Sequence, residues 1–252
     1  MISLVKYAGG KAFLLDDIFK MFNEMDVGTV LEVFGGSAKF LLNVREFTLD
    51  GRRFLVYNDR DRRMSNLFTI VRDNPDALVR KFEYAITSRV WFDEFKDDTG
   101  DPITDAFREL YILLVCDFDS GSYHSSRGND KVPNFDVIIR RIREVHKVVR
   151  NWIIECLNYV DFIKRWDRED AFLYLDPPYL DNPYYRYNFS ESDFRLLYNV
   201  LRNVKGRYIM NVGASDTIRR IFGEPSIVKE YRNVTVTDHD SYRDEWFYTN
   251  VK

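Results

Sequence analysis

Short runs of apolar residues alternate along this chain with longer segments in which apolar residues recur every three or four positions. The short runs have the length of buried strands and begin at Thr29, Arg53, Ala171 and Arg207. The segment 12–22 shows helical spacing instead, with Phe13, Leu14, Ile18 and Met21 on one side. Alternation of strands and helices predicts an α/β fold built on a largely parallel sheet.

The middle of the chain departs from this alternation. Residues 75–159 are predicted to be mostly helical, over 75–89, 103–118 and 135–159. This segment is longer than a crossover between two strands requires, so we expect an inserted helical lobe. The main domain then comprises 1–74 and 160–252, closing with a hairpin of strands 227–236 and 245–250.

The strand that begins at Ala171 ends in unusual chemistry, Ala171-Phe-Leu-Tyr-Leu-Asp-Pro-Pro-Tyr179. Pro177 and Pro178 have no backbone N–H to donate, so the strand must stop at Asp176. Ligands of open α/β sheets bind beyond the carboxyl ends of the strands. Asp176 is therefore the best candidate for a catalytic residue, with a rigid turn as the plain structural alternative.

Two further strand ends carry residues suited to a cofactor. In Glu32-Val-Phe-Gly-Gly-Ser-Ala38, the glycines allow a ligand to lie against the backbone, and Glu32 is placed to face it. Asp59 follows the next strand, where such folds hold a ribose by its hydroxyls, although a helix cap for 60–72 explains it equally well. A third glycine loop, Lys6-Tyr-Ala-Gly-Gly-Lys11, is not a phosphate loop, because it lacks the upstream glycine and Ala12 replaces the magnesium-binding Ser or Thr.

Charge provides no global signal for nucleic acid, since the net charge is −3. Any DNA-binding surface must be local. The densest basic cluster is Arg140, Arg141, Arg143, Lys147 and Arg150, which do not share one helical face. The polar, glycine-punctuated loop 119–131, with Arg127 and Lys131, is able to reach a groove.

Cysteine and histidine positions argue against two kinds of chemistry. Cys116 and Cys156 stand in apolar surroundings, so we expect buried thiols in a reducing compartment and no covalent thiol mechanism. His124, His146 and His239 share no metal-ligand spacing, and we expect no metal. Without a membrane-length apolar run or a secretion pattern, we expect a cytoplasmic protein.

Taken in order, four motifs resemble the Dam-type N6-adenine DNA methyltransferases: Lys6–Lys11, Glu32–Ala38, Tyr57-Asn-Asp59 and Asp176-Pro-Pro-Tyr179. The resemblance runs over nearly the whole chain and implies a Rossmann-like, S-adenosylmethionine-dependent methyltransferase sheet whose inserted helical lobe recognises DNA. Tyr7, Val33 and Ala38 depart from the family, which often has Trp, Pro and Gly at these positions.

The resemblance also implies roles for individual residues. Asp176, Pro177, Pro178 and Tyr179 would form the catalytic turn, with Tyr179 stacking on a flipped adenine in duplex DNA. The cofactor set would be Tyr7, Lys11, Glu32, Phe34, Gly36, Asp59 and Asp176. DNA contacts are expected from Arg127, Lys131, Arg140, Arg141 and Lys147, and a restriction endonuclease is a conceivable partner. Methylation of RNA, of cytosine N4 or of a protein amide, and a catalytically lapsed DNA-binding module, remain alternatives.

Overall fold

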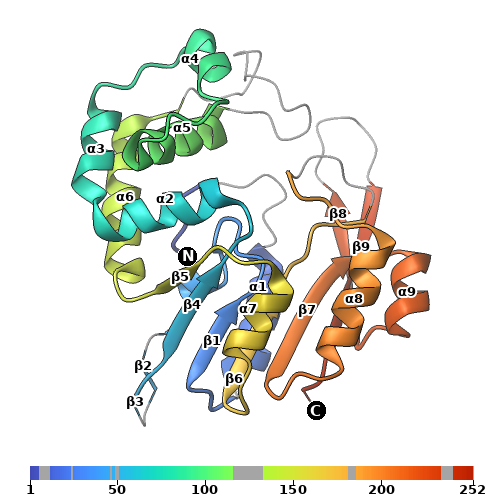
Figure 1. The fold of residues 1–252 in the computed structure, drawn as a ribbon. Helices are drawn as coiled ribbons and strands as arrows, with labels where there is room; N and C mark the ends of the chain where they lie inside the picture. Colours follow the sequence, from blue (N-terminus) through green and yellow to red (C-terminus); the bar gives the residue numbers. More distant parts are fainter. Residues whose placement is uncertain are drawn as a thin grey trace.

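The computed structural model describes residues 1–5, 12–23, 25–45, 47–48, 51–115, 133–180, 186–233 and 241–251. Its centre is a seven-stranded sheet in the order β5-β4-β1-β6-β7-β9-β8 (Figure 1). The strands are β1 (Thr29–Glu32), β4 (Phe54–Asn58), β5 (Ile153–Glu155), β6 (Ala171–Leu175), β7 (Arg207–Gly213), β8 (Ile227–Asn233) and β9 (Ser241–Thr249). A separate two-stranded ribbon joins β2 (Phe47–Thr48) to β3 (Gly51–Arg52).

Five neighbouring strands of the sheet, β5 to β7 in spatial order, run parallel. They follow the 3-2-1-4-5 order of doubly wound folds, and β9 inserts antiparallel between β7 and β8. The predicted α/β class, Rossmann-like sheet and terminal hairpin are therefore confirmed. Because the strands are parallel, the carboxyl ends of β1, β4 and β6 meet at one edge, the upper one in Figure 1.

Helices cover both faces of the sheet, and strand residues alternate between them. On one face, Leu31, Leu173 and Met210 pack under α7 (Tyr159–Trp166), α8 (Glu191–Leu201) and α9 (Asp216–Phe222). On the other, Val30, Phe172 and Ile209 pack with α1 (Ala12–Asn23). Strands buried on both faces explain why their sequences are continuously apolar.

The helical lobe contains α2 (Arg62–Asp73), α3 (Pro75–Glu83), α4 (Arg89–Glu94), α5 (Pro102–Val115) and α6 (Phe135–Val149). Helices α2, α3, α5 and α6 pack on one another beside the sheet, at the upper left of Figure 1. Their apolar residues join those of the α1 face in one continuous core. The short 3₁₀ helix η1 (Leu41–Asn43) packs against α6.

Two helix predictions in this lobe need correction. The helix expected over 75–89 ends at Glu83, and α4 begins separately, capped by the Ser88 side chain. The helix expected over 135–159 is wrong beyond Val149, because Ile153–Glu155 pair with β4 as a strand of the sheet. Asn158 then caps α7 by accepting from the N–H groups of Val160 and Asp161.

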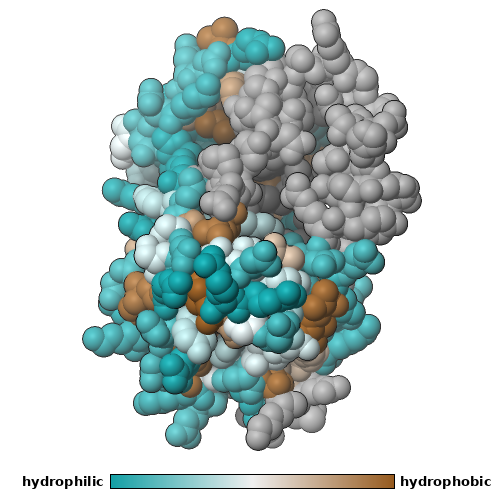
Figure 2. Space-filling model, turned by 90° about the vertical axis from the view of Figure 1, so that its right-hand side faces the viewer, coloured by the Kyte–Doolittle hydropathy of each residue, from teal (hydrophilic) through white to brown (hydrophobic). Residues whose placement is uncertain are grey.

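The outer surface beside β8 and α9 is mostly hydrophilic. Figure 2, which turns this side toward the viewer, shows apolar residues as separate spots among polar ones. Scattered apolar residues of this kind are normal for a protein surface. Among the described residues, no helix combines the length and apolar character that a membrane span requires.

Candidate active site

A cavity opens at the carboxyl ends of β1, β4 and β6, where the sequence predicted a ligand site. It encloses a volume of about 170 Å³. Its walls come from the strand ends and from the segment 186–189. The predicted residues on its lining are Phe34, Gly36, Asp59, Asp176 and Pro178.

Asp176 follows the last residue of β6 directly, as the two prolines require. Its carboxylate is held from β7, where Asn211 Nδ2 donates to Asp176 Oδ1 at 3.0 Å. Pro177 is buried and Pro178 lines the cavity. The hydroxyl of Tyr179 donates to Glu245 Oε1 on β9 at 2.5 Å. The Asp-Pro-Pro-Tyr turn is thus supported at both its ends.

The glycine turn after β1 lies tightly against the end of β4. A Cβ added at Gly35 would stand 2.2 Å from the Tyr57 ring and 2.8 Å from the carbonyl oxygen of Asn58, so only glycine fits there. The carbonyl oxygen of Gly36 accepts from the Tyr57 hydroxyl at 2.9 Å. At Gly36 the φ angle is +46°, and a Cβ would meet no atom of the described residues within 4 Å. The backbone is therefore open to a ligand at this point.

Ala38, which replaces a family glycine, has a φ angle of +55° and is fully buried. Residues with a Cβ adopt this left-handed region at a cost of about 1–2 kcal/mol, which glycine avoids. The turn therefore keeps the glycine conformation although the glycine is absent. Two hydrogen bonds hold it there. The Ala38 N–H donates to the carbonyl oxygen of Gly35 at 2.7 Å, and the Leu42 N–H donates to the carbonyl oxygen of Ala38 at 2.9 Å.

Asp59 binds the glycine turn and does not cap the following helix. Its Oδ2 accepts from the Gly36 N–H at 2.7 Å and its Oδ1 from the Asp61 N–H at 2.7 Å. The N-cap of α2 is Asp61, whose side chain accepts from Arg63 N. Burial raises the pKa of Asp59 to about 6, against the lowering effect of these two hydrogen bonds. Each carboxylate oxygen can accept a second hydrogen bond, and Asp59 is part of the cavity lining.

Glu32 is placed differently from the expectation that it faces a cofactor. It is buried beneath the glycine turn, where its carboxylate accepts from the N–H groups of Leu41 at 2.9 Å and Phe40 at 3.3 Å. It therefore caps η1 and is not part of the cavity lining. Burial raises its pKa to about 8, with the nearby Asp176 and Asp59 adding to the shift.

One wall of the cavity is a cluster of three rings, of which the sequence singled out only Phe34. Phe34 lies 5.5 Å from the Tyr159 ring and 5.4 Å from the Phe189 ring, between centroids. Burial raises the pKa of Tyr159 to about 12, and its hydroxyl donates to the carbonyl oxygen of Asp193. The cap pattern at Asn158 was the available signal that a new helix begins at Tyr159.

The rim of the cavity connects the segment 186–189 to the helical lobe. Arg186 contacts Asp61 Oδ2 at 2.8 Å and Glu109 Oε2 at 3.2 Å. Glu109 belongs to α5 and is buried, which raises its pKa. Arg60 lies over the Tyr187 ring, 4.7 Å from its centroid. The tyrosine-rich loop was expected above the site, and its described residues, 186–189, do line it.

The remaining predicted residues are not gathered at this cavity. Tyr7, Lys11, Arg127 and Lys131 lie outside the described residues, as do Cys116, His124 and His239. Arg140 and Lys147 are exposed on α6 and Arg141 is half-buried. Cys156, expected to be buried, is exposed because it follows the last residue of β5. Among the described residues, no group of three or more His, Cys, Asp or Glu side chains is arranged to hold a metal ion.

Comparison with known proteins identifies the family. The model of the D12 class N6 adenine-specific DNA methyltransferases matches residues 7–236. This chain belongs to that family. It is also 24% identical, over 239 residues, to the Type II methyltransferase M.CviBI of Paramecium bursaria Chlorella virus NC1A, covering 88% of this chain and 86% of the relative. The protein is therefore an adenine-specific DNA methyltransferase. Methyltransferases use S-adenosylmethionine in general, so the predicted cofactor class is confirmed at that level.

Proposed function

We propose that this methyltransferase transfers the methyl group of S-adenosylmethionine to the N6 amine of an adenine flipped out of duplex DNA, with Asp176 as the catalytic residue. The observation that supports this most directly is that Asp176 lines the same cavity as Gly36 and Asp59. A carboxylate able to receive an amine and a backbone able to receive a cofactor thus share one space.

The cofactor half of the cavity is assigned to Phe34, Gly36 and Asp59, together with Tyr7 and Lys11. The open backbone at Gly36 allows close approach of a ligand, Asp59 offers acceptors to ribose hydroxyls, and Phe34 offers an aromatic face. Glu32 acts from beneath by holding the turn. When bound, S-adenosylmethionine supplies an electrophilic methyl group on a positively charged sulfur.

The base half is assigned to the Asp-Pro-Pro-Tyr turn. The target amine is inaccessible inside the duplex, so the base must be extruded at a cost of a few kcal/mol (order of magnitude), which stacking on Tyr179 offsets. Asp176 and the carbonyl oxygen of Pro177 accept the two N–H bonds of the amine and direct its lone pair toward the methyl group. As the nitrogen–methyl bond forms, the sulfur–methyl bond breaks with its electron pair left on sulfur, and the surplus amine proton leaves through the contact with Asp176. Pro177 and Pro178 fix that carbonyl because their backbone is rigid.

The test is methyl transfer from tritiated S-adenosylmethionine to duplex DNA, to RNA and to protein, followed by identification of the modified base. We expect label on adenine N6 of duplex DNA. Label on cytosine N4, on RNA or on a protein amide would show that the substrate is that molecule and not adenine in duplex DNA. Binding of S-adenosylmethionine without methyl transfer to DNA, RNA or protein would indicate a DNA-binding module that has lost its activity.

We also propose that the helices of the predicted insertion, 75–159, read DNA, in support of which Arg140 and Lys147 are exposed on α6. Arg127→Ala should relax target preference at one position, with a loss of roughly 1–3 kcal/mol of discrimination, because an arginine fork pairs bidentately with guanine. Sequencing of methylated DNA reads this change. Replacing Arg140, Arg141 or Lys147 should weaken binding to all sequences and flatten its salt dependence. An unchanged motif with uniformly lower activity would reassign Arg127 to phosphate contact.

A restriction endonuclease with the same target is the partner we propose, since the relative M.CviBI is named a Type II methyltransferase. Extracts of the source cells should then cleave unmodified DNA and spare DNA treated with this enzyme. Equal cleavage of both DNAs would contradict the pairing.

A further inference from the structure

Two buried polar side chains lie beneath the Asp-Pro-Pro-Tyr turn and outside the four motifs quoted above. Asn211 on β7 is fully buried and donates from Nδ2 to Asp176 Oδ1 at 3.0 Å. Glu245 on β9 is 7% exposed and accepts from the Tyr179 hydroxyl at 2.5 Å. Each therefore contacts one end of the turn that carries the proposed chemistry.

The pairing of β7 with β9 places these residues together. Gly213 pairs with Glu245, and Asn211 lies two residues before Gly213 on β7. Residues directly opposite in an antiparallel pair share a face, as do residues two apart on one strand. Asn211, Gly213 and Glu245 thus form one row on the face of the sheet that α1 covers. The Tyr179 ring closes over this row, because a Cβ added at Gly213 would stand 3.3 Å from Tyr179 Cδ2.

Polar groups at these positions act against stability. An apolar residue would suit the interior of the sheet, whereas a buried amide or carboxyl must be compensated by hydrogen bonds. The compensation at Asn211 is incomplete within the described part of the chain, since its Oδ1 is buried and has no hydrogen-bond partner there. A buried polar group that is not fully satisfied requires an explanation other than packing.

We propose that Asn211 and Glu245 are positioning residues that set the two ends of the catalytic turn before the base arrives. Asn211 fixes the plane of the Asp176 carboxylate, and Glu245 fixes the ring of Tyr179. This inference rests on the proposed roles of Asp176 and Tyr179. It assigns the two supports to different steps, Asn211 to methyl transfer and Glu245 to capture of the extruded base.

The Asn211 arm is tested with Asn211→Ala in single-turnover methyl transfer. We expect the rate to fall roughly ten-fold or more, while donor affinity and the signal of a fluorescent adenine analogue at the target stay unchanged. Asn250→Ala is the matched control, because Asn250 also anchors strand ends through its side chain but at the opposite edge of the sheet. Asn211→Asp keeps the volume and serves if the alanine variant fails to fold.

The role of Glu245 is tested by base capture, measured from the signal of the fluorescent adenine analogue at the target position. Glu245→Leu should reduce base capture roughly three- to ten-fold, as expected for one lost hydrogen bond. Tyr179→Phe should reproduce that loss, and the double variant should show no additional loss, because the two changes break the same bond. Glu245→Gln retains an acceptor and should rescue capture.

The outcomes separate this inference from the proposed function. Wild-type single-turnover rates in a folded Asn211 variant, or additive losses for Tyr179→Phe and Glu245→Leu, would overturn the positioning roles alone if Asp176→Ala is inactive. Full activity of Asp176→Ala would overturn the proposed function instead.

Discussion

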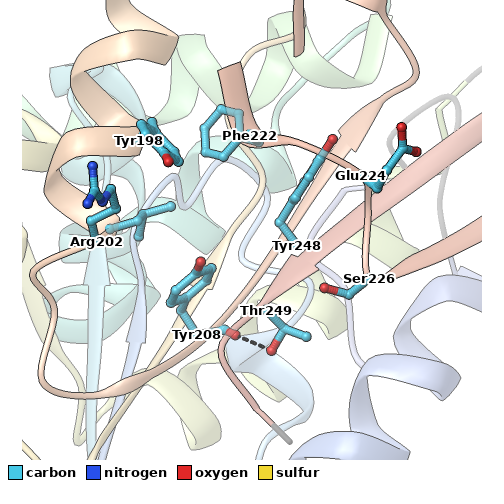
Figure 3. A pocket seen from close by; sticks show the side chains of 9 residues that line it. Tyr198, Arg202, Tyr208, Phe222, Glu224, Ser226, Tyr248 and Thr249 are labelled. Atoms are coloured by element: carbon cyan, nitrogen blue, oxygen red, sulfur yellow. Dashed lines mark hydrogen bonds between the residues drawn. The ribbon is translucent and has the colours of Figure 1, made fainter. Parts of the chain in front are cut away.

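The two ends of the sheet each carry a cavity, and the two cavities differ in kind. Their volumes are equal, at about 170 Å³ each, but their linings are not. The cavity at the carboxyl ends is lined by Asp59, Asp61, Asp176 and Asp193 besides aromatic rings. The cavity at the amino ends lies between α8, α9, β7 and β9, and Figure 3 shows the rings of Tyr198, Tyr208, Phe222 and Tyr248 around it.

Two polar side chains of the second cavity are hydrogen-bonded to the surrounding backbone. Tyr248 donates to the carbonyl oxygen of Gly223 at 3.1 Å, and Thr249 Oγ1 donates to that of Tyr208 at 2.6 Å (Figure 3). Burial raises a pKa at both cavities, but it brings that of Asp59 toward neutrality, to about 6, and moves that of Tyr248 away from it, to about 12. A carboxyl group with a pKa near neutrality is the kind of perturbed group that clusters at functional sites. A cavity between packed elements is therefore not enough to indicate a site, whereas acids gathered beyond parallel strand ends are.

The largest expected effect comes from Asp176→Ala. Methyl transfer should fall at least about 100-fold while the fold is retained, because the carboxylate lies beyond the strand and not in the core. Steady-state kinetics with tritiated donor and circular dichroism measure both quantities. Tyr248→Phe, at the other cavity, is the control and should keep full activity. Comparable losses of methyl transfer in both variants would show that activity does not depend on the cavity at the carboxyl ends more than on the other.

Asp59→Ala should weaken binding of S-adenosylmethionine roughly 10- to 100-fold, because hydrogen bonds to a charged group are lost at the ribose and at the glycine turn. Isothermal titration calorimetry measures the affinity. Asp167→Ala is the matched control, since Asp167 likewise accepts from backbone N–H groups, of Lys205 and Gly206, but at the amino ends of the strands. Equal affinity of the Asp59 variant and the wild type would place the ribose elsewhere.

Glu32→Gln should change how stability depends on pH. The folded-state pKa of about 8 lies above the ordinary value of 4.5, so the folded state holds a proton that the unfolded state has released. The stability linked to Glu32 is fully present below pH 4.5 and is lost as pH rises through 8, by about 1.4 kcal/mol per pH unit within that window. Denaturant unfolding from pH 5 to 8 should show a shallower decline in the glutamine variant. An identical decline would mean that Glu32 is not the group responsible.

The smallest effect is expected from Ala38→Gly. Glycine adopts the φ angle of +55° without the Cβ clash, so the free energy of unfolding should rise by roughly 0.5–1 kcal/mol. Urea unfolding measures the change. A less stable glycine variant would show that the buried Cβ contributes more than the strain removes.

The sequence predicts those parts of the site that depend on neighbours along the chain. Two prolines end β6 at Asp176, and the glycines after β1 predict the tight turn that Gly35 and Gly36 form. The sequence does not predict whether a residue at a strand end faces the cavity, because this depends on which N–H groups the next turn presents. Glu32 is the example, since its carboxylate accepts from the turn and does not line the cavity.

Local sequence patterns could not predict contacts between residues on distant strands. Asn211 and Asp176 are 35 residues apart, and Glu245 and Tyr179 are 66 apart. Only the register of β7 with β6 and β9 brings these pairs together. The strand β5 was missed for a similar reason, since three residues carry too little periodicity to separate a strand from the end of a helix.

The lobe leaves the sheet after β4 and returns to it at β5, and these two strands are hydrogen-bonded neighbours, with Val56 paired to Ile153. Both attachment points are therefore fixed a single strand spacing apart, whatever the chain does between them. A change in the length of this segment therefore need not move the ends of β4 and β5. What ties the lobe to the rest of the molecule is the shared apolar core and the ion pair between Glu109 and Arg186 at the rim of the cavity.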